Sequence, residues 1–139
     1  MKGLIIDEPW ISLILSGQKT WELRSRNIRV RGPIALIRKG SGAVIGTANL
    51  TGTLPTLAQS NLRSNFAKHR VPISEIGKDF KWSTAWVLVD PRQLFEAVPY
   101  QHPTGAVIWV NLAPAVGASV ERAKWTSGSQ THSPPASPG

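Results

Sequence analysis

The sequence predicts an α+β fold, a small mixed β-barrel of five to six strands with two or three short helices and a disordered C-terminal tail. Short strand-forming runs are spaced too closely for repeated parallel crossovers. Helix signals interrupt these runs at only a few places. After residue 112 the chain is rich in Pro, Ser, Thr and Gly, a composition that cannot bury enough surface to offset chain entropy. We therefore expect one domain over residues 1–112 and a disordered tail over residues 113–139.

Runs of strand-forming residues bounded by turn residues predict six strands. They cover residues 2–6, 20–26, 34–39, 43–53, 84–89 and 106–112. The last two runs are continuously apolar, which is typical of core strands, and we expect Trp86 and Trp109 to lie in the core. Gly46 interrupts the fourth run and indicates a bulge or a close approach of backbone. The proline-rich residues 90–105 are expected to connect the last two strands.

Helix signals occur at three places. An acidic pair before Pro9 is typical of a helix start and Gly17 of a helix end, so we expect a short buried helix over residues 8–15. A capping-box pattern predicts a second helix over residues 56–69. A further helical turn is expected from Pro72 onward.

The strand predicted over residues 20–26 has two different faces. Trp21 and Leu23 alternate with polar residues that include Glu22, so one face is expected to be buried and the other polar. Strand parity would place Lys19 on the face opposite Glu22. The two side chains meet only if Lys19 still belongs to the turn after the helix.

The charge of the chain bears on its partners. Sixteen Lys and Arg against eight Asp and Glu give a net charge of +8. Seven of the basic residues fall between residues 19 and 39, where Glu22 is the only acidic residue. Such a field favours polyanions such as nucleic acid. The alternative is that the basic excess only keeps the protein in solution.

Composition also limits the compartment and the cofactors. The apolar runs are far shorter than the roughly 20 residues of a membrane-spanning helix, and the N-terminus does not have the pattern of a signal peptide. No cysteine is present, which excludes disulfides and thiolate metal sites. The histidines His69, His102 and His132 show no metal-ligand spacing. We expect a cytoplasmic protein with no membrane contact, no metal and no cofactor.

Several segments carry a family resemblance. In order along the chain they are EPWISLILSGQKTWELRS, RGPIALI, VIGTANL, HRVP, AWVLVDPRQL and VPYQHPTGAVIWV. Over about residues 2–112 this order resembles a bacterial ASCH domain of the PUA-like superfamily. The helix followed by G-x-K-T-x-E-x-R, residues 17–24 here, resembles the family hallmark. The resemblance implies a PUA-like β-barrel with a cleft that presents the hallmark residues, and RNA or a modified nucleoside or nucleotide as the partner.

The resemblance also suggests a chemistry. Some bacterial members of the family are amidohydrolases that remove acyl groups from N4-acetylcytidine with a Lys, a Thr and a Glu, and another is reported as a ribonuclease. The amidohydrolase lysine matches Lys19. Glu22 stands where these enzymes have threonine, and His69 falls near the place of their glutamate.

Lys19, Glu22 and His69 are therefore the candidate catalytic residues. A desolvated Lys19 would act as a base or nucleophile, whereas a lysine kept charged by Glu22 would clamp a phosphate or polarise a carbonyl; a plain surface lysine at a helix end is the third alternative. Glu22 would serve as a general acid or base, accept from an exocyclic amine, or only pair with Arg24 or Lys39. His69 would assist catalysis or organise its loop.

Further residues are candidates for binding the ligand. They are Trp10, Thr20, Arg24, Arg26, Lys39, Ser41, Tyr100 and His102. Trp10 at the cleft rim and Tyr100 in an exposed loop could stack on a base. Ser41 suits a contact to phosphate or ribose, unless it is only the tip of a hairpin. His102, like His69, is a loop organiser or a functional group.

The sequence thus predicts an RNA- or nucleotide-binding domain with a basic cleft around the G-x-K-T-x-E-x-R motif. The alternative is a hydrolase that acts on N4-acylated cytidine nucleosides or on single-stranded RNA, with Lys19 and Glu22 as the catalytic pair. A third possibility is a domain that contacts other proteins through its basic face. Whether the protein is an enzyme, and its oligomeric state, are left open.

Overall fold

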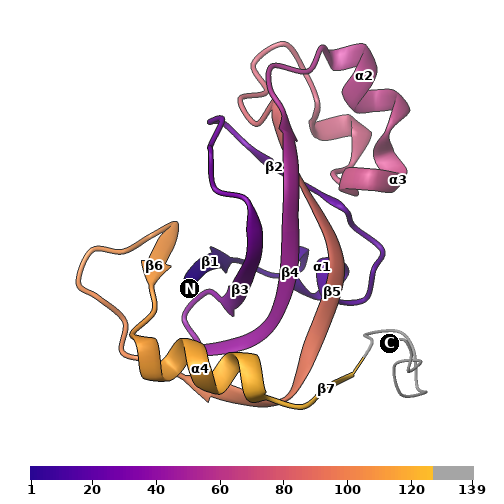
Figure 1. The fold of residues 1–139 in the computed structure, drawn as a ribbon. Coiled ribbons are helices and arrows are strands. Elements are labelled where there is room, and N and C mark those ends of the chain that lie inside the picture. The colour runs from indigo at the N-terminus through magenta and orange to yellow at the C-terminus, as the bar shows by residue number, and fades with distance from the viewer. Residues whose placement is uncertain (127–139) are drawn as a thin grey trace.

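One curled β-sheet organises the molecule (Figure 1). The computed structural model describes residues 1–126 of the chain. The strands are β1 (Lys2–Ile6), β2 (Trp21–Arg24), β3 (Gly32–Arg38), β4 (Ala43–Leu54), β5 (Thr84–Pro99), β6 (Trp109–Asn111) and β7 (Trp125–Thr126). Their order is β2-β5-β4-β3-β1-β6, and β7 pairs with β5. Among the strands of residues 1–126, only β1 and β3 run parallel, which makes the sheet mixed and confirms the predicted α+β, barrel-like class in the form of a half-barrel.

Short helices lie around this sheet. They are α1 (Trp10–Leu15), α2 (Gln59–Ser64), α3 (Phe66–His69), the single 3₁₀ turn η1 (Ile73–Glu75) and α4 (Pro114–Arg122). In Figure 1, α2 and α3 lie together at one end of the sheet and α4 crosses the other end. Within residues 1–126, none of these helices has the length and apolar character needed to cross a membrane.

Three apolar clusters fill the space between sheet and helices. The first packs α1 against alternate residues of β1, β3 and β5, among them Trp86, on which the half-buried Trp109 stacks at 5.8 Å between ring centroids. The second packs the opposite faces of β1 and β3 against α4 through Val120. The third places Trp21 and Leu23 of β2 under α2 and the segment that follows α3. The buried apolar face predicted for β2 is confirmed.

Gly46 explains how β4 curls around α1. A Cβ atom at this position would collide with the side chain of Leu15 and would lie 2.8 Å from the carbonyl oxygen of Arg92. The pairing of β4 with β5 shifts register between Val44 and Gly46. The predicted bulge and close backbone approach are both present, and they let α1 sit deep in the concave side of the sheet.

The predicted connection over residues 90–105 differs from the structure, because β5 continues to Pro99. Asp90 has a φ of 53° and the pairing with β4 passes from Val89 to Arg92, so Pro91 lies in an interruption of the ladder. A proline is tolerated there because no ladder hydrogen bond is required of it.

The predicted start of the tail at residue 113 is wrong. Residues up to Thr126 are folded, with α4 beginning at Pro114 and β7 pairing with Leu94. Proline suits the first turn of a helix, and Val120 is buried beside Leu112. A composition averaged over the tail hid these local signals. The predicted disorder of residues 127–139 lies outside the described residues.

Candidate functional site

The hallmark motif is held in place by the end of α1. Gly17 has a φ of 84°, a left-handed conformation that glycine adopts without strain. The backbone N–H groups of Gln18 and Lys19 then both donate to the carbonyl of Leu13. Lys19 therefore belongs to the turn and not to β2, and its Nζ lies 3.7 Å from Oε1 of Glu22.

Lys19 carries a buried ammonium group, with 1% of its side chain exposed. Its Nζ donates to the carbonyl of His69 at 2.6 Å and lies 4.8 Å from the centroid of the Trp10 ring. Burial lowers the pKa of Lys19 from 10.5 to about 8, and the negative charge of Glu22 opposes this effect. Lys19 is thus a lysine close to its titration range at neutral pH.

Glu22 is buried although it lies on the polar face of β2. Its Oε2 accepts from Nε of Arg24 at 2.8 Å, while its Oε1 faces Lys19. Arg24 also donates through Nη2 to the carbonyl of Ile5 at 3.1 Å and lies over the ring of Trp86. The charged side chains on the polar face of β2 are therefore paired with one another, and this face is not a solvated surface.

His69 contributes its backbone to the site. Its ring is buried, with Nδ1 accepting from the N–H of Val71 at 2.9 Å and Nε2 at 2.6 Å from the carbonyl of Leu62. Since Nδ1 accepts, Nε2 carries the proton and the ring is neutral. Burial lowers the pKa of His69 below its usual value, which also favours the neutral ring. Both ring nitrogens are occupied, so His69 orders the chain after α3 and presents its carbonyl to Lys19.

A cavity of about 520 Å³ opens over the motif. It is lined by Asp7, Trp10, Lys19, Glu22, Leu23, Arg24, Lys39, Val71, Glu75, Phe80 and Trp82. Three of these residues are basic and three are acidic, so the cavity is balanced in charge and is not the basic cleft that the sequence predicts. Trp10 and an edge-to-face pair of Phe80 and Trp82, with centroids 5.4 Å apart, supply aromatic surface.

A second cavity of about 660 Å³ adjoins the first. It is lined by Ile5, Asp7, Arg24, Lys39, Gly40, Gly42, Tyr100, His102, Ala106 and Val107. Because Asp7, Arg24 and Lys39 line both cavities, the two adjoin each other, and we call the two together the groove. Tyr100, expected in an exposed loop, is half-buried directly after β5.

Three predicted ligand-binding residues do not line either cavity. The carbonyl of Arg26 accepts from Nε1 of Trp86 at 2.8 Å, while the Arg26 side chain is exposed. Thr20 is held by backbone bonds to Lys68 and Leu88. Ser41 bonds within its own turn to Ala43.

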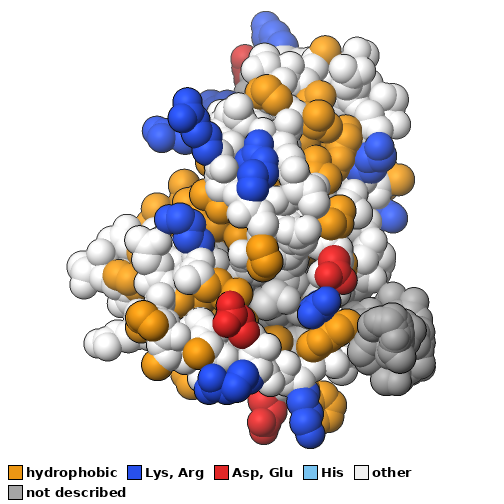
Figure 2. Space-filling model, in the orientation of Figure 1, with side chains coloured by type: hydrophobic (Ala, Val, Ile, Leu, Met, Phe, Trp, Pro, Cys, Tyr) orange, Lys and Arg blue, Asp and Glu red, His pale blue; other side chains and the backbone are white. Residues whose placement is uncertain are grey.

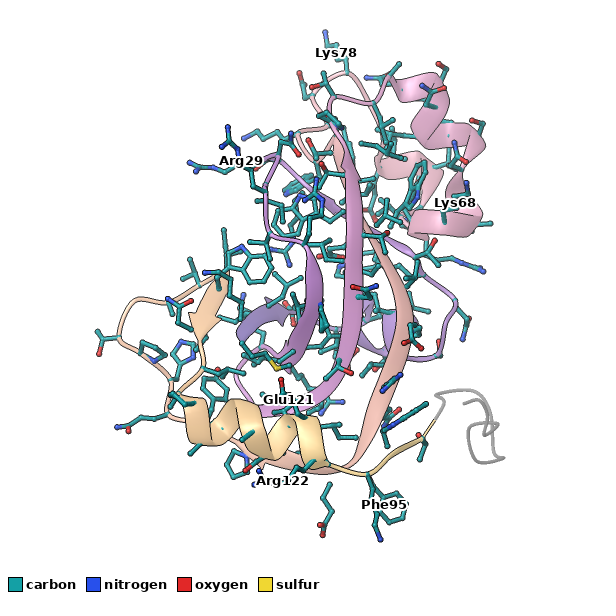
Figure 3. All side chains as sticks on the ribbon, in the orientation of Figure 1. Arg29, Lys68, Lys78, Phe95, Glu121 and Arg122 are labelled. Atoms are coloured by element: carbon teal, nitrogen blue, oxygen red, sulfur yellow. The ribbon has the colours of Figure 1, made fainter. Side chains whose placement is uncertain are left out.

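The remaining basic residues are spread over the surface. On the face shown in Figure 2, Lys and Arg side chains are scattered over several elements. Figure 3 shows Arg29 and Lys78 extending outward from the fold. Within the described part of the chain, no group of three or more His, Asp or Glu residues is arranged to hold a metal ion.

Sequence reasoning missed one wall of the first cavity. Glu75, Phe80 and Trp82 come from η1 and the segment that leads into β5. This segment has no helical or strand periodicity. Its one usable signal is the alternation of aromatic and basic residues in KDFKW, a composition typical of nucleic-acid contacts.

Comparison with known proteins identifies the fold and the family. The family model of the ASCH domain matches residues 4–99. The crystal structure of ASCH from Zymomonas mobilis superimposes with a TM-score of 0.63 at 17% identity, covering 88% of this chain and 95% of that one. Two single-residue mutants of the same protein give TM-scores of 0.62 and 0.63 at 17% and 18% identity, covering 88% of this chain and 98% and 96% of theirs. No curated protein matches the chain. With the family model spanning more than half of the sequence and the fold shared with these structures, the chain belongs to the ASCH domain family, whose fold is PUA-like.

Proposed function

We propose that this ASCH domain binds a nucleotide unit of RNA, with the base in the first cavity. The observation that carries the proposal is the buried pair of Lys19 and Glu22 at the base of an aromatic-lined cavity. Cavities that bind small molecules usually measure roughly 300–1,000 Å³, so one base with its ribose fits this size class.

The pair offers one donor and one acceptor side by side. Lys19 uses one of its three N–H groups on the carbonyl of His69, which leaves two for a ligand. Oε1 of Glu22 lies 3.7 Å from Lys19, beyond hydrogen-bond distance, and so retains its capacity to accept. A base edge with an amino group next to a ring nitrogen, as in cytosine or adenine, matches this arrangement.

The surroundings favour a flat neutral group. Three positive and three negative residues around the cavity cancel in sum, which suits an uncharged base better than a phosphate. Trp10, Phe80 and Trp82 offer ring faces, and stacking on an aromatic side chain contributes roughly 1–3 kcal/mol per base.

The binding test compares nucleotides that differ in this edge. We expect cytidine monophosphate to bind more tightly than uridine monophosphate by about tenfold, since one lost charge-assisted hydrogen bond costs about 1.4 kcal/mol or more. Trp10→Leu should weaken the binding of both nucleotides. Trp125→Leu should not weaken it, because Trp125 lines neither cavity. Titration calorimetry that shows equal affinities for the two nucleotides, or no effect of Trp10→Leu, would contradict the proposal.

Hydrolysis is a second candidate, favoured by the lowered pKa of Lys19. With a pKa of about 8, on the order of a tenth of the protein carries a neutral Lys19 amine at pH 7. In an N4-acylated cytidine, this amine would take a proton from water as the water attacks the acyl carbonyl. The C–N bond then breaks, and the proton passes from Lys19 to the departing N4 amine. Glu22 accepts a hydrogen bond from this amine, and the products are cytidine and the carboxylic acid.

Turnover decides between binding and hydrolysis. Wild type and Lys19→Met are incubated with N4-acetylcytidine and, separately, with single-stranded RNA, and products are separated by chromatography. Product from the wild type alone supports catalysis by Lys19. Absence of product, or equal product from both proteins, leaves the binding function and removes the hydrolase.

A further inference from the structure

The second cavity is not used by the proposed function, yet it adjoins the first. The two cavities meet at Asp7, Arg24 and Lys39, which line both. The acidic residues Glu22 and Glu75 line only the first. Among the charged residues of the second cavity, two are therefore basic and one is acidic. The net charge of the lining residues therefore changes from zero in the first cavity to positive in the second.

Lys39 provides the free positive charge at the junction. Its backbone N–H donates to the carbonyl of Ile6 at 3.0 Å, which fixes the start of the turn between β3 and β4. Its side chain is exposed and forms no ion pair within residues 1–126. Gly40 and Gly42 follow with φ values of 81° and 68°, and in the described part of the chain no atom lies within 4 Å of a Cβ placed at either of them. A phosphate can therefore approach both the ammonium and the turn.

Tyr100 and His102 form a fixed aromatic wall beyond this junction. Oη of Tyr100 lies 2.7 Å from Nδ1 of His102, and Nε2 of His102 lies 2.9 Å from the carbonyl of Ala106. Both contacts are satisfied when Tyr100 donates to Nδ1 and Nε2–H donates to the carbonyl. The N–H of Tyr100 donates to the carbonyl of Gly42, which ties the wall to the turn. With their polar atoms paired, the two rings offer their apolar faces.

We infer that the second cavity is the subsite for the neighbouring nucleotide of a single-stranded RNA. This inference rests on the proposed function, which places one base in the first cavity. The linking phosphate lies over Lys39 and Arg24, and the second base stacks on the ring of Tyr100, with the ring of His102 tilted by 59° beside it. The ligand class is then a strand of at least two nucleotides and not a free nucleoside.

Asp7 is compatible with this arrangement. Its carboxylate repels a phosphate, but Oδ1 already accepts from the N–H of Glu8 at 2.9 Å. Asp7 lines both cavities, and its remaining acceptor capacity suits a ribose hydroxyl on either side of the phosphate. The strand therefore passes Asp7 with its sugar and Lys39 with its phosphate.

The test compares cytidine monophosphate with the dinucleotide CpC, which each carry one phosphate. We expect CpC to bind the wild type at least about fivefold more tightly, since one added stacked base contributes roughly 1–3 kcal/mol. Tyr100→Leu should remove this gain and leave the affinity for the monophosphate within twofold. Phe95→Leu is the matched control, because Phe95 lies on the same stretch of chain and points into solvent (Figure 3).

A second arm tests the phosphate. Lys39→Ala should weaken the binding of CpC. It should also reduce the slope of log K against log salt concentration by about 0.7, the value for one phosphate contact with a single strand. Lys124→Ala should change neither the affinity nor the slope. Equal affinity of the wild type for monophosphate and dinucleotide, or a gain that survives both Tyr100→Leu and Lys39→Ala, overturns the inference and leaves the first site intact. A wild type that binds neither ligand overturns the proposed function as well.

Discussion

Lys19 holds its proton weakly because its ammonium is buried, and this has a measurable effect on stability. The folded pKa is about 8, below the value of 10.5 for the free side chain. Well below pH 8 both states are protonated, and pH then has almost no effect through this group. Between pH 8 and 10.5 the folded protein releases the proton while the unfolded chain keeps it. Because the unfolded state binds more protons, the free energy of unfolding rises with pH in this window.

Lys19→Met isolates this contribution. The difference between the unfolded pKa of 10.5 and the folded pKa of about 8 corresponds to roughly 3 kcal/mol of free energy of unfolding. Most of this free energy is gained by about pH 10. We expect urea denaturation to show the wild type gaining about 2–3 kcal/mol more than Lys19→Met between about pH 7 and pH 10. Other titrating groups, including Tyr100 with its pKa raised by burial, are common to both proteins and cancel. Parallel pH profiles for the two proteins would refute a lowered pKa at Lys19.

Two further changes test the architecture. Gly46→Ala should lower the free energy of unfolding by about 1–3 kcal/mol, because the new methyl meets a backbone carbonyl. Gly52→Ala is the control and should not show this loss, because no described atom lies within 4 Å of a Cβ placed there. Urea titration of both variants measures the difference. A chain ending at Leu112 should melt several degrees below a chain ending at Thr126, because it lacks Val120 of α4. Circular dichroism measures the melting, and equal melting of the two truncated chains would contradict a stabilising role for α4.

Local signals account for the part of the site that the sequence could predict. Gly17 ends α1 and the alternation of Trp21 and Leu23 sets the faces of β2, so the neighbourhood of Lys19 and Glu22 follows from adjacent residues. The same reasoning placed Gly46 at a bulge. These features depend on backbone conformation and side-chain periodicity over a few residues.

Long-range packing accounts for what could not be predicted. Glu75 and Trp82 reach the cavity only because the chain after α3 folds back over β2. The role of His69 depends on two backbone partners, Leu62 and Val71, that no spacing rule connects. α4 was hidden because its burial comes from strands far away in the sequence.

The sheet leaves its two edges unjoined, and this shapes how a ligand would act on the fold. β2 pairs only with β5 and β6 only with β1 in the described part of the chain, and the guanidinium of Arg24 links β2 to the carbonyl of Ile5 across the gap. A phosphate at Arg24, as proposed above, would compete with the carbonyl of Ile5 for that guanidinium. In the proposed binding mode, occupancy of the groove would then be linked to the curvature of the sheet: a ligand that prefers one curvature would stabilise it, and a substitution that alters the curvature would alter affinity without touching the ligand.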